Sequence, residues 1–294
     1  MRFPLMLAAA LALAPALAGC AATPHPDVMA TFYPIQYFAQ RIAGPGLSVG
    51  SVVKPGSEPH DYEPTPKDLD QVVHAKALVI VGAGFEAWLQ TAQRQAPDTA
   101  LVTASTGIGL HDNPDRDEAA NLPSDPHIWM DPVLAQQMVA NIESGLAAAF
   151  PDHAARIHAN AAELRGDLQG LDDRYREGLA HCKTPYAITS HAAFGYMAQR
   201  YNFTQVPVTG LDPEAEPSPE DVRNAVETAK AHNITVIFFE DQLSPKVAET
   251  IAREAGPGVH TAVLSPIEFA PEGKDYFDLM HADLAALRDG MKCQ

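Results

Sequence analysis

Three histidines stand where a strand or a loop is expected to give way to the next helix. His60 lies in a proline-rich turn, His127 lies in the stretch 125–132, and His191 directly follows the predicted strand 186–189. A neutral imidazole nitrogen is a good ligand for a borderline-soft metal ion, so three imidazoles together favour Zn²⁺ over harder ions. The histidines are 67 and 64 residues apart, so no single local motif contains them. A common site therefore requires a fold that brings distant segments together.

The segments around these histidines alternate between strand-like and helix-like patterns in both halves of the chain. Continuous apolar runs predict buried strands at 28–32, 77–81 and 100–103 in the first half, and at 186–189, 205–209, 236–239 and 261–264 in the second. Continuous apolar strands separated by helices favour parallel sheets that are covered on both faces. Ligands of such folds bind in a cleft at the carboxyl ends of the strands. We therefore expect the histidines to face a cleft between two α/β halves.

Between the halves, helical spacing of apolar residues is unbroken from Asp152 to about Ala180. At about 1.5 Å per residue, this helix would span roughly 40–45 Å. We interpret it as a connector; the alternative is a core helix of one large domain. The sequence thus predicts an α/β protein of two lobes, each a mainly parallel sheet flanked by helices, bridged by one long rigid helix. The predicted parts are an N-terminal metal-binding lobe at 20–150, a linking helix at 151–181 and a C-terminal metal-binding lobe at 182–294.

The amino terminus has the features of an export signal. Met1 and Arg2 precede an apolar stretch at 3–17 that is too short to anchor the chain across a bilayer, so 1–19 is predicted to be a signal peptide. Leu17-Ala18-Gly19-Cys20 resembles the site where a bacterial lipoprotein is cleaved before a lipidated cysteine. The alternative is an ordinary signal peptide cut nearby. Either way, we expect a periplasmic or otherwise extracytoplasmic protein, tethered to a membrane if Cys20 is lipidated.

The charge of the chain is strongly acidic, with 37 acidic residues against 20 basic ones and a formal net charge of −17. Such a surface repels nucleic acid and anionic lipid, so neither is an expected partner. It also raises the local concentration of cations, although acidity serves plain solubility as well.

Two cysteines, Cys182 and Cys293, remain after the predicted cleavage. In an oxidising compartment they could form a disulfide that closes the C-terminal half. Two buried free thiols are the alternative.

The contexts of the three histidines resemble the metal-specific solute-binding proteins of zinc and manganese ABC transporters, including their lipoprotein members. The matching stretches run in order along essentially the whole mature chain and lie at 58–66, 125–132, 190–196, 210–218 and 238–246. The resemblance implies two α/β lobes bridged by one long helix, with the metal buried between them. In this family, a histidine in the third ligand position points to zinc and a glutamate to manganese; here that residue is His191.

The chain departs from the family pattern at the fourth ligand position. The family often has an aspartate in a Leu-Asp-Pro stretch, where this chain has Ser265 between Leu264 and Pro266. A serine hydroxyl is a poor zinc ligand at neutral pH. We therefore expect the fourth ligand to be water or a nearby carboxylate such as Glu240 or Glu268. The predicted metal set is His60, His127, His191 and Glu240, with the fourth position open.

The resemblance implies a binding protein that captures Zn²⁺ and delivers it to the permease of an ABC transporter, without enzymatic activity. The expected protein is a monomer, and a periplasmic zinc chaperone is a further candidate partner. The alternatives are a manganese-binding homologue, a secreted zinc hydrolase with three histidine ligands, and a surface adhesin. The hydrolase finds no support in an H-E-x-x-H, G-x-S-x-G or glycine-rich phosphate motif.

Other residues near the predicted site have two readings. Trp129 and Tyr62 either wall the site or pack in the core. His111, in the polar stretch 107–126, is a solvated loop residue or else a transient capture site. The remaining histidines are expected to be ordinary surface or packing residues without partners; examples are His74, His153, His158, His181, His232 and His281.

Overall fold

The computed structural model describes residues 25–113, 122–241 and 243–294. The predicted signal peptide at 1–19, Cys20 and the acidic residues of the loop 114–121 lie outside these ranges. Within the described residues, no helix is long and apolar enough to cross a membrane.

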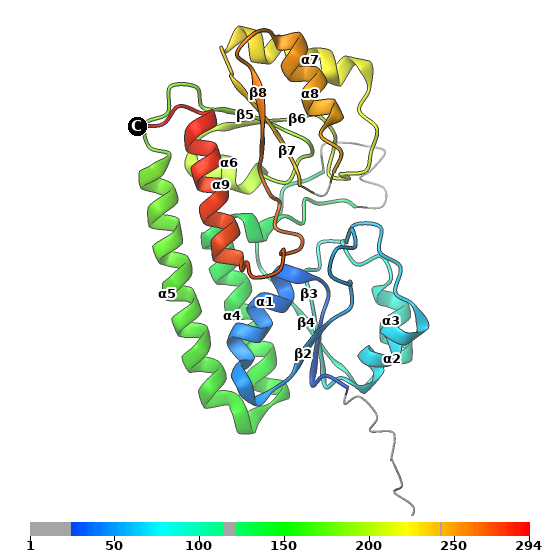
Figure 1. Ribbon diagram of the computed structural model, residues 1–294. Coiled ribbons are helices and arrows are strands. Elements are labelled where there is room, and N and C mark those ends of the chain that lie inside the picture. The colour runs from blue at the N-terminus through cyan, green and yellow to red at the C-terminus, as the bar shows by residue number, and fades with distance from the viewer. Residues whose placement is uncertain (1–24, 114–121, 242) are drawn as a thin grey trace, which may run out of the picture.

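Two four-stranded parallel sheets form the two lobes, which confirms the predicted fold class (Figure 1). The first sheet has the order β2-β1-β3-β4, from β1 (Val28–Ala30), β2 (Val49–Ser51), β3 (Ala77–Ile80) and β4 (Ala100–Thr103). The second sheet repeats this arrangement as β6-β5-β7-β8, from β5 (Tyr186–Thr189), β6 (Thr204–Pro207), β7 (Val236–Phe239) and β8 (His260–Val263).

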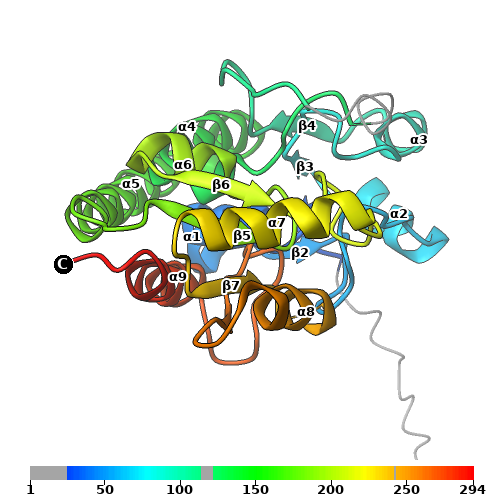
Figure 2. The same ribbon diagram turned by 90° about the horizontal axis from the view of Figure 1, so that it is seen from above.

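Nine α-helices surround the sheets within the described residues. They are α1 (Tyr33–Ala43), α2 (Pro66–His74), α3 (Leu89–Gln95), α4 (Pro132–Ala149), α5 (Ala154–Gly178), α6 (Gly195–Tyr201), α7 (Pro219–Ala231), α8 (Lys246–Ala255) and α9 (Tyr276–Gly290). In Figure 1, α2 and α3 lie on one side of the first sheet, and α1 and α4 lie on the other. Seen from above, α7 and α8 lie away from α5 and α9 in the second lobe (Figure 2).

The central strands β1, β3 and β7 are apolar throughout because both of their faces are covered. Along β1, Val28 and Ala30 belong to the core shared with α1 and α4, whereas Met29 packs with residues of α2 and α3. Successive side chains of a strand point to opposite faces, so a strand between two helical layers has no polar face. In β7, Ile237 likewise packs with α7 and α8, and Phe238 packs on the opposite side.

The predicted long helix is present as α5, although it is shorter than the sequence pattern suggested. A separate 3₁₀ turn at Pro151–His153 precedes it, and the helix has 25 residues, or about 37 Å. Its buried side chains join a single apolar core that includes residues from both lobes, from Val28 to Met291. The helix therefore bridges the lobes by packing into their common core. The proposed division at residues 150 and 181 stays a prediction.

The last helix, α9, leaves the second sheet and packs on elements of the first lobe. Tyr276 at its start stacks on Tyr37 of α1, with ring centroids 5.8 Å apart, and meets Phe38 edge-on at 5.0 Å. At the level of the buried side chains, the C-terminal segment thus completes the core of the N-terminal lobe.

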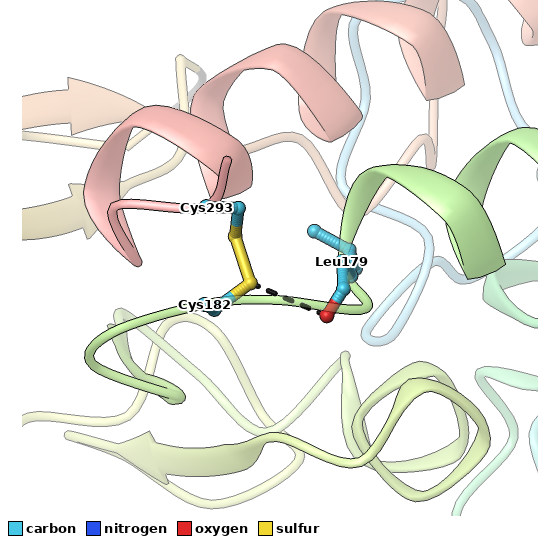
Figure 3. Close-up of a disulfide and its surroundings, with 3 residues drawn as sticks. All are labelled: Leu179, Cys182 and Cys293. Carbon is cyan, nitrogen blue, oxygen red and sulfur yellow. Dashed lines mark hydrogen bonds between the residues drawn. A yellow bond between two sulfur atoms is a disulfide. The ribbon is translucent and has the colours of Figure 1, made fainter.

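A disulfide joins Cys182 to Cys293, so the alternative of two free thiols is wrong. Figure 3 shows the two sulfur atoms bonded, with the Leu179 carbonyl oxygen 3.3 Å from the Cys182 sulfur. Backbone hydrogen bonds flank the bond: the Thr184 amide donates to Met291, and the Gln294 amide donates to His181. The chain end is therefore fixed beside the end of α5.

Reduction of this disulfide should lower the free energy of unfolding by about 2–5 kcal/mol, because the bond closes a long loop, with a sequence separation of 111, in the unfolded chain. Urea unfolding with and without dithiothreitol measures the change. A Cys182→Ala/Cys293→Ala double variant is the control and should unfold at the same urea concentration in both conditions. Equal midpoints for the unmodified chain would contradict the prediction.

Candidate metal centre

Four side chains from distant segments meet between the lobes, near the carboxyl ends of the strands. His60 follows β2, His127 follows β4, His191 follows β5 and Glu268 follows β8. The first two come from the first lobe and the last two from the second. The three predicted histidines are therefore brought together, and the carboxylate that joins them is Glu268.

The potential ligand atoms are already spaced for a small tetrahedral ion. The Glu268 Oε1 atom lies 3.0 Å from His60 Nε2, 3.3 Å from His127 Nε2 and 3.8 Å from His191 Nε2. The two Nε2 atoms of His127 and His191 are 3.3 Å apart. In a regular tetrahedron with metal–ligand bonds of 2.0–2.1 Å, ligand atoms are about 3.3–3.4 Å apart. These four distances are close to those of a zinc coordination shell, and all four atoms lie within 4.8 Å of one another.

The site is shielded from water. The side chains of His127 and His191 are fully buried, and those of His60 and Glu268 are 5% and 6% exposed. The His60 ring also meets Phe85 edge-on, with centroids 4.9 Å apart. A buried carboxylate among imidazoles is costly unless its charge is compensated, so this group of side chains favours a bound cation.

Two imidazoles are oriented by carboxylates on the side away from the centre. The Nδ1 atom of His127 is 2.8 Å from Asp125 Oδ1, and that of His191 is 2.6 Å from Glu240 Oε1. If each Nδ1–H donates to its carboxylate, each Nε2 is left with a free electron pair facing the other ligands. Such a partner fixes the ring orientation and strengthens the nitrogen as a ligand.

Glu240 was the predicted fourth ligand, but the structure places its carboxylate behind the His191 ring, outside the group of converging ligand atoms. Both Glu240 and Glu268 follow strands of the second sheet. Their neighbouring positions at the same sheet edge explain why the sequence alone could not separate them.

Ser265, which stands where the family often has an aspartate ligand, has a structural role in the turn 264–268. The Ser265 hydroxyl accepts a hydrogen bond from the Ile267 amide at 3.1 Å, and the Ser265 amide donates to Asp283 at 2.9 Å. Ile267 has a positive φ of 59°, which turns the chain sharply. The Trp129 indole N–H donates to the Pro266 carbonyl oxygen at 2.8 Å and holds the turn against the first lobe. Ser265 thus shapes the turn that delivers Glu268.

The charges of the site depend on one another. Burial alone would raise the pKa of Glu268, but the positive potential of His60 and the hydrogen bonds from His127 and His60 hold it well below its usual range. Burial alone would lower the pKa of His127, but hydrogen bonds to Asp125 and Glu268 outweigh it and raise the pKa to about 9. The shifts of both pKa values therefore have a common cause, the close pairing of the Glu268 carboxylate with the His127 imidazole.

Two hollows border the centre. One, of about 200 Å³, is lined by Glu58, Glu214, Glu240, Asp241 and Glu268 together with apolar residues. The other, of about 300 Å³, is lined by His60, Asp61 and Asp212 together with apolar residues. Acidic walls attract cations and raise their rate of encounter. Acidic side chains thus line both approaches to the ligand atoms.

Trp129 serves both of the roles considered for it. It is fully buried, its ring lies 5.0 Å from that of His127, and it also packs edge-on against Phe32.

His111 is not a free loop residue: its ring stacks on Tyr196 at 4.1 Å, and its Nε2 lies 2.7 Å from Gln199 Oε1.

Asp125 and Asp68 are supporting residues that the sequence analysis did not single out. Asp125 had a usable signal, because it stands two residues before His127 and can reach its ring from the same turn. Asp68 had only the signal of a capping box at the start of α2.

Asp68 ties down the loop that carries His60. Its buried carboxylate pairs with Lys54, accepts a hydrogen bond from the Tyr62 hydroxyl at 2.9 Å, and accepts two from Thr65 at 2.7 and 3.0 Å. Burial alone would raise the pKa of Asp68, but hydrogen bonds from Lys54 and Thr65 lower it to about 2, so the carboxylate is charged at neutral pH. One side chain thus fixes both ends of the loop 54–65, and Tyr62 belongs to this support.

Asp68→Ala should weaken Zn²⁺ binding at least fivefold, because the freed loop must be ordered again when His60 engages the ion, at about 1 kcal/mol per residue fixed. Competition titration with a chromophoric chelator measures the affinity. Asp221→Ala is the matched control, because Asp221 forms the same capping box with Ser218 on the exposed start of α7. It should lose about 1 kcal/mol of stability and keep its affinity. Equal zinc affinities in both variants would show that Asp68 does not order the loop 54–65 for zinc binding.

The chain is similar to known proteins of zinc uptake. Residues 28–290 match the family model described as zinc-uptake complex component A, periplasmic. The chain is 36% identical over 279 residues to the high-affinity zinc uptake system protein ZnuA of Bacillus subtilis, covering 90% of this chain and 87% of that protein. It is 35% identical over 285 residues to the zinc-binding protein AdcA of Streptococcus pyogenes, covering 89% of this chain. The match covers 55% of that relative, so the chain spans about half of its length.

A solved structure shows the same arrangement of elements. The Zn(II)-bound ZnuA-like domain of Streptococcus pneumoniae AdcA has a TM-score of 0.77 and 32% identity to this chain, covering 91% of this chain and 99% of that one. The family match spans most of the sequence, and both curated relatives exceed 30% identity over about nine tenths of it. This chain therefore belongs to the ZnuA family, the periplasmic component A of zinc-uptake complexes.

Proposed function

We propose that this protein captures Zn²⁺ outside the cytoplasm and delivers it to the permease of an ABC transporter. The observation that carries the proposal is the convergence of three Nε2 atoms and one carboxylate oxygen at tetrahedral spacing in a buried site. The family description, a periplasmic component of a zinc-uptake complex, supports the same role.

The proposed ligands are His60, His127, His191 and Glu268, with Asp125 and Glu240 as orienting partners. Three nitrogen ligands and one oxygen ligand suit a tetrahedral borderline-soft ion, whereas Mn²⁺ favours more oxygen ligands and a larger coordination number. The carboxylates of Glu268, Asp125 and Glu240 together offset the charge of a divalent ion. This donor set therefore favours zinc over the manganese alternative.

A binding role fits the site better than hydrolysis. A catalytic zinc centre keeps an open position for water, beside three protein ligands. Here the fourth position faces the Glu268 carboxylate at 3.0–3.8 Å from the three Nε2 atoms. The proposed centre is closed, which suits an ion that is carried and not one that activates water.

Release of the ion would involve the ligand-bearing loops more than a wide opening of the lobes. Both lobes share one buried core, and α5 and α9 pack across it. The loop 54–65 and the turn 264–268 carry one ligand each and lie beside the acidic hollow. We propose that contact with the permease shifts these two segments and lowers the affinity for zinc.

The setting of this cycle follows from the sequence. We propose that the protein acts as a monomer at the outer face of the membrane, anchored through a lipid on Cys20. A periplasmic zinc chaperone that loads the site is a further proposed partner. The disulfide between Cys182 and Cys293 supports an oxidising compartment.

Substitutions at the four proposed ligands should weaken zinc binding at least a hundredfold, because each removes one of four protein ligands from a buried site that water reaches poorly. The variants are His60→Ala, His127→Ala, His191→Ala and Glu268→Ala, compared with His158→Ala on the exposed side of α5. Elemental analysis and competition titration with Zn²⁺ and Mn²⁺ provide the measurement. We expect the unsubstituted chain to bind one zinc ion tightly and in preference to manganese. Among the variants, only His158→Ala should keep this binding. Unchanged binding in the ligand variants would reject the site.

The two glutamates should behave differently. Glu240→Gln keeps a hydrogen-bond acceptor for His191 and should weaken zinc binding by about 10–100-fold, the usual effect of losing an orienting carboxylate. Glu268→Gln removes a ligand and should have the larger effect, and Ser265→Ala should have little. A larger effect at Glu240 than at Glu268 would reverse the assignment.

A further inference from the structure

A second group of metal-ligating side chains lies on the surface of the first lobe. It consists of His25, Asp70 and His74, and one potential ligand atom from each lies within 4.8 Å of the others. We propose that these three residues form a second, exposed binding site for a divalent transition-metal ion such as Zn²⁺. The inference concerns residues separate from the His60 centre and does not depend on the proposed transport function.

The two imidazoles and the carboxylate face one another closely. The rings of His25 and His74 stack with centroids 4.1 Å apart and planes inclined by 18°. The Nδ1 atoms of His25 and His74 lie 4.0 Å and 3.5 Å from oxygen atoms of Asp70. A tetrahedral zinc shell needs ligand atoms about 3.3–3.4 Å apart, so the two rings must turn out of their stacked arrangement to aim one nitrogen each at a common ion. Water would complete the coordination.

The helix positions two of the ligands. Asp70 and His74 are one turn apart on α2, so their side chains project from the same face. The His74 Nδ1 atom also lies 2.8 Å from the Asp70 carbonyl oxygen, a contact that a metal ion bound at this nitrogen would replace. His74 also lies in the last turn of α2, where the negative end of the helix dipole favours a cation.

The third ligand is held in place by the start of the first sheet. Asp27, two residues after His25, accepts hydrogen bonds from the Ser48 hydroxyl and amide, at 2.7 and 2.8 Å. Its carbonyl oxygen accepts from the Lys76 amide at 2.9 Å, just beyond the end of α2. These contacts fix the segment 25–27 beside His74. The sequence analysis assigned His74 no partner, and that expectation was wrong.

The surroundings of this group distinguish it from the buried centre. It lies at the amino ends of β1 and β3, whereas His60 and its partners lie near the carboxyl ends of the strands. Its side chains are 35–53% exposed, so an ion there keeps contact with water and exchanges readily. With three protein ligands and no burial, this site binds more weakly than the buried one. The inferred role is a low-affinity surface site that holds a metal ion at the opposite end of the lobe.

Isothermal titration of the untagged, metal-free protein with Zn²⁺ tests the inference. The expected result is one tight equivalent followed by one weaker equivalent. His25→Ala and His74→Ala should each weaken the second equivalent at least tenfold and leave the first unchanged. His232→Ala, a histidine stacked on Tyr186 in the other lobe, is the matched control and should change neither.

The two sites can fail independently. His191→Ala should lose the tight equivalent and keep the weaker one, so a failure of the proposed transport site would not resemble a failure of this one. Histidine NMR signals provide a second readout, since those of His25 and His74 should shift only as the second equivalent is added. A weaker equivalent that is absent, or that survives unchanged in both His25→Ala and His74→Ala, would overturn the inference.

Discussion

The charge of the Glu268 carboxylate, buried against three imidazoles, is the constraint on which the rest of the site depends. A buried charge costs several kcal/mol unless it is paired and hydrogen-bonded. His60 and His127 supply that pairing through Nε2 atoms 3.0 and 3.3 Å away. Asp125 and Glu240 then hold His127 and His191 from behind. A divalent cation at the centre of these four side chains would compensate the same buried charge.

Contacts between the lobes hold the ligand-bearing segments in position relative to one another. The Trp129 indole donates to the Pro266 carbonyl oxygen, and the Tyr276 hydroxyl donates to the Trp129 carbonyl oxygen at 2.5 Å. Arg200 of α6 meets Asp131 at the start of α4 at 2.8 Å. Each of these contacts joins a segment near one ligand to an element of the other lobe. These contacts hold the two lobes together around the ligand atoms, and Asp68 holds the loop 54–65 beside them.

The sequence was informative where local pattern decides the outcome. Continuous apolar strands and a long run of helical spacing predicted both sheets and α5, and the contexts of His60, His127 and His191 predicted which histidines meet. Which of Glu240 and Glu268 lies beside all three imidazoles was not predictable, because their placement depends on the turn set by Ser265 and the positive φ of Ile267. The pairing of His25 with His74 was hidden for a similar reason. Parallel strands bring the segment before β1 beside the end of α2, and no local pattern records that contact.

The most direct test of the central claim is a crystal structure of the zinc-loaded protein with anomalous data collected at the zinc absorption edge. The account predicts one strong peak between the lobes, about 2.0–2.1 Å from the Nε2 atoms of His60, His127 and His191 and from one oxygen atom of Glu268. Glu240 should remain on the far side of His191. A zinc ion bound by Glu240, or bound by the three histidines with Glu268 turned away, would contradict it.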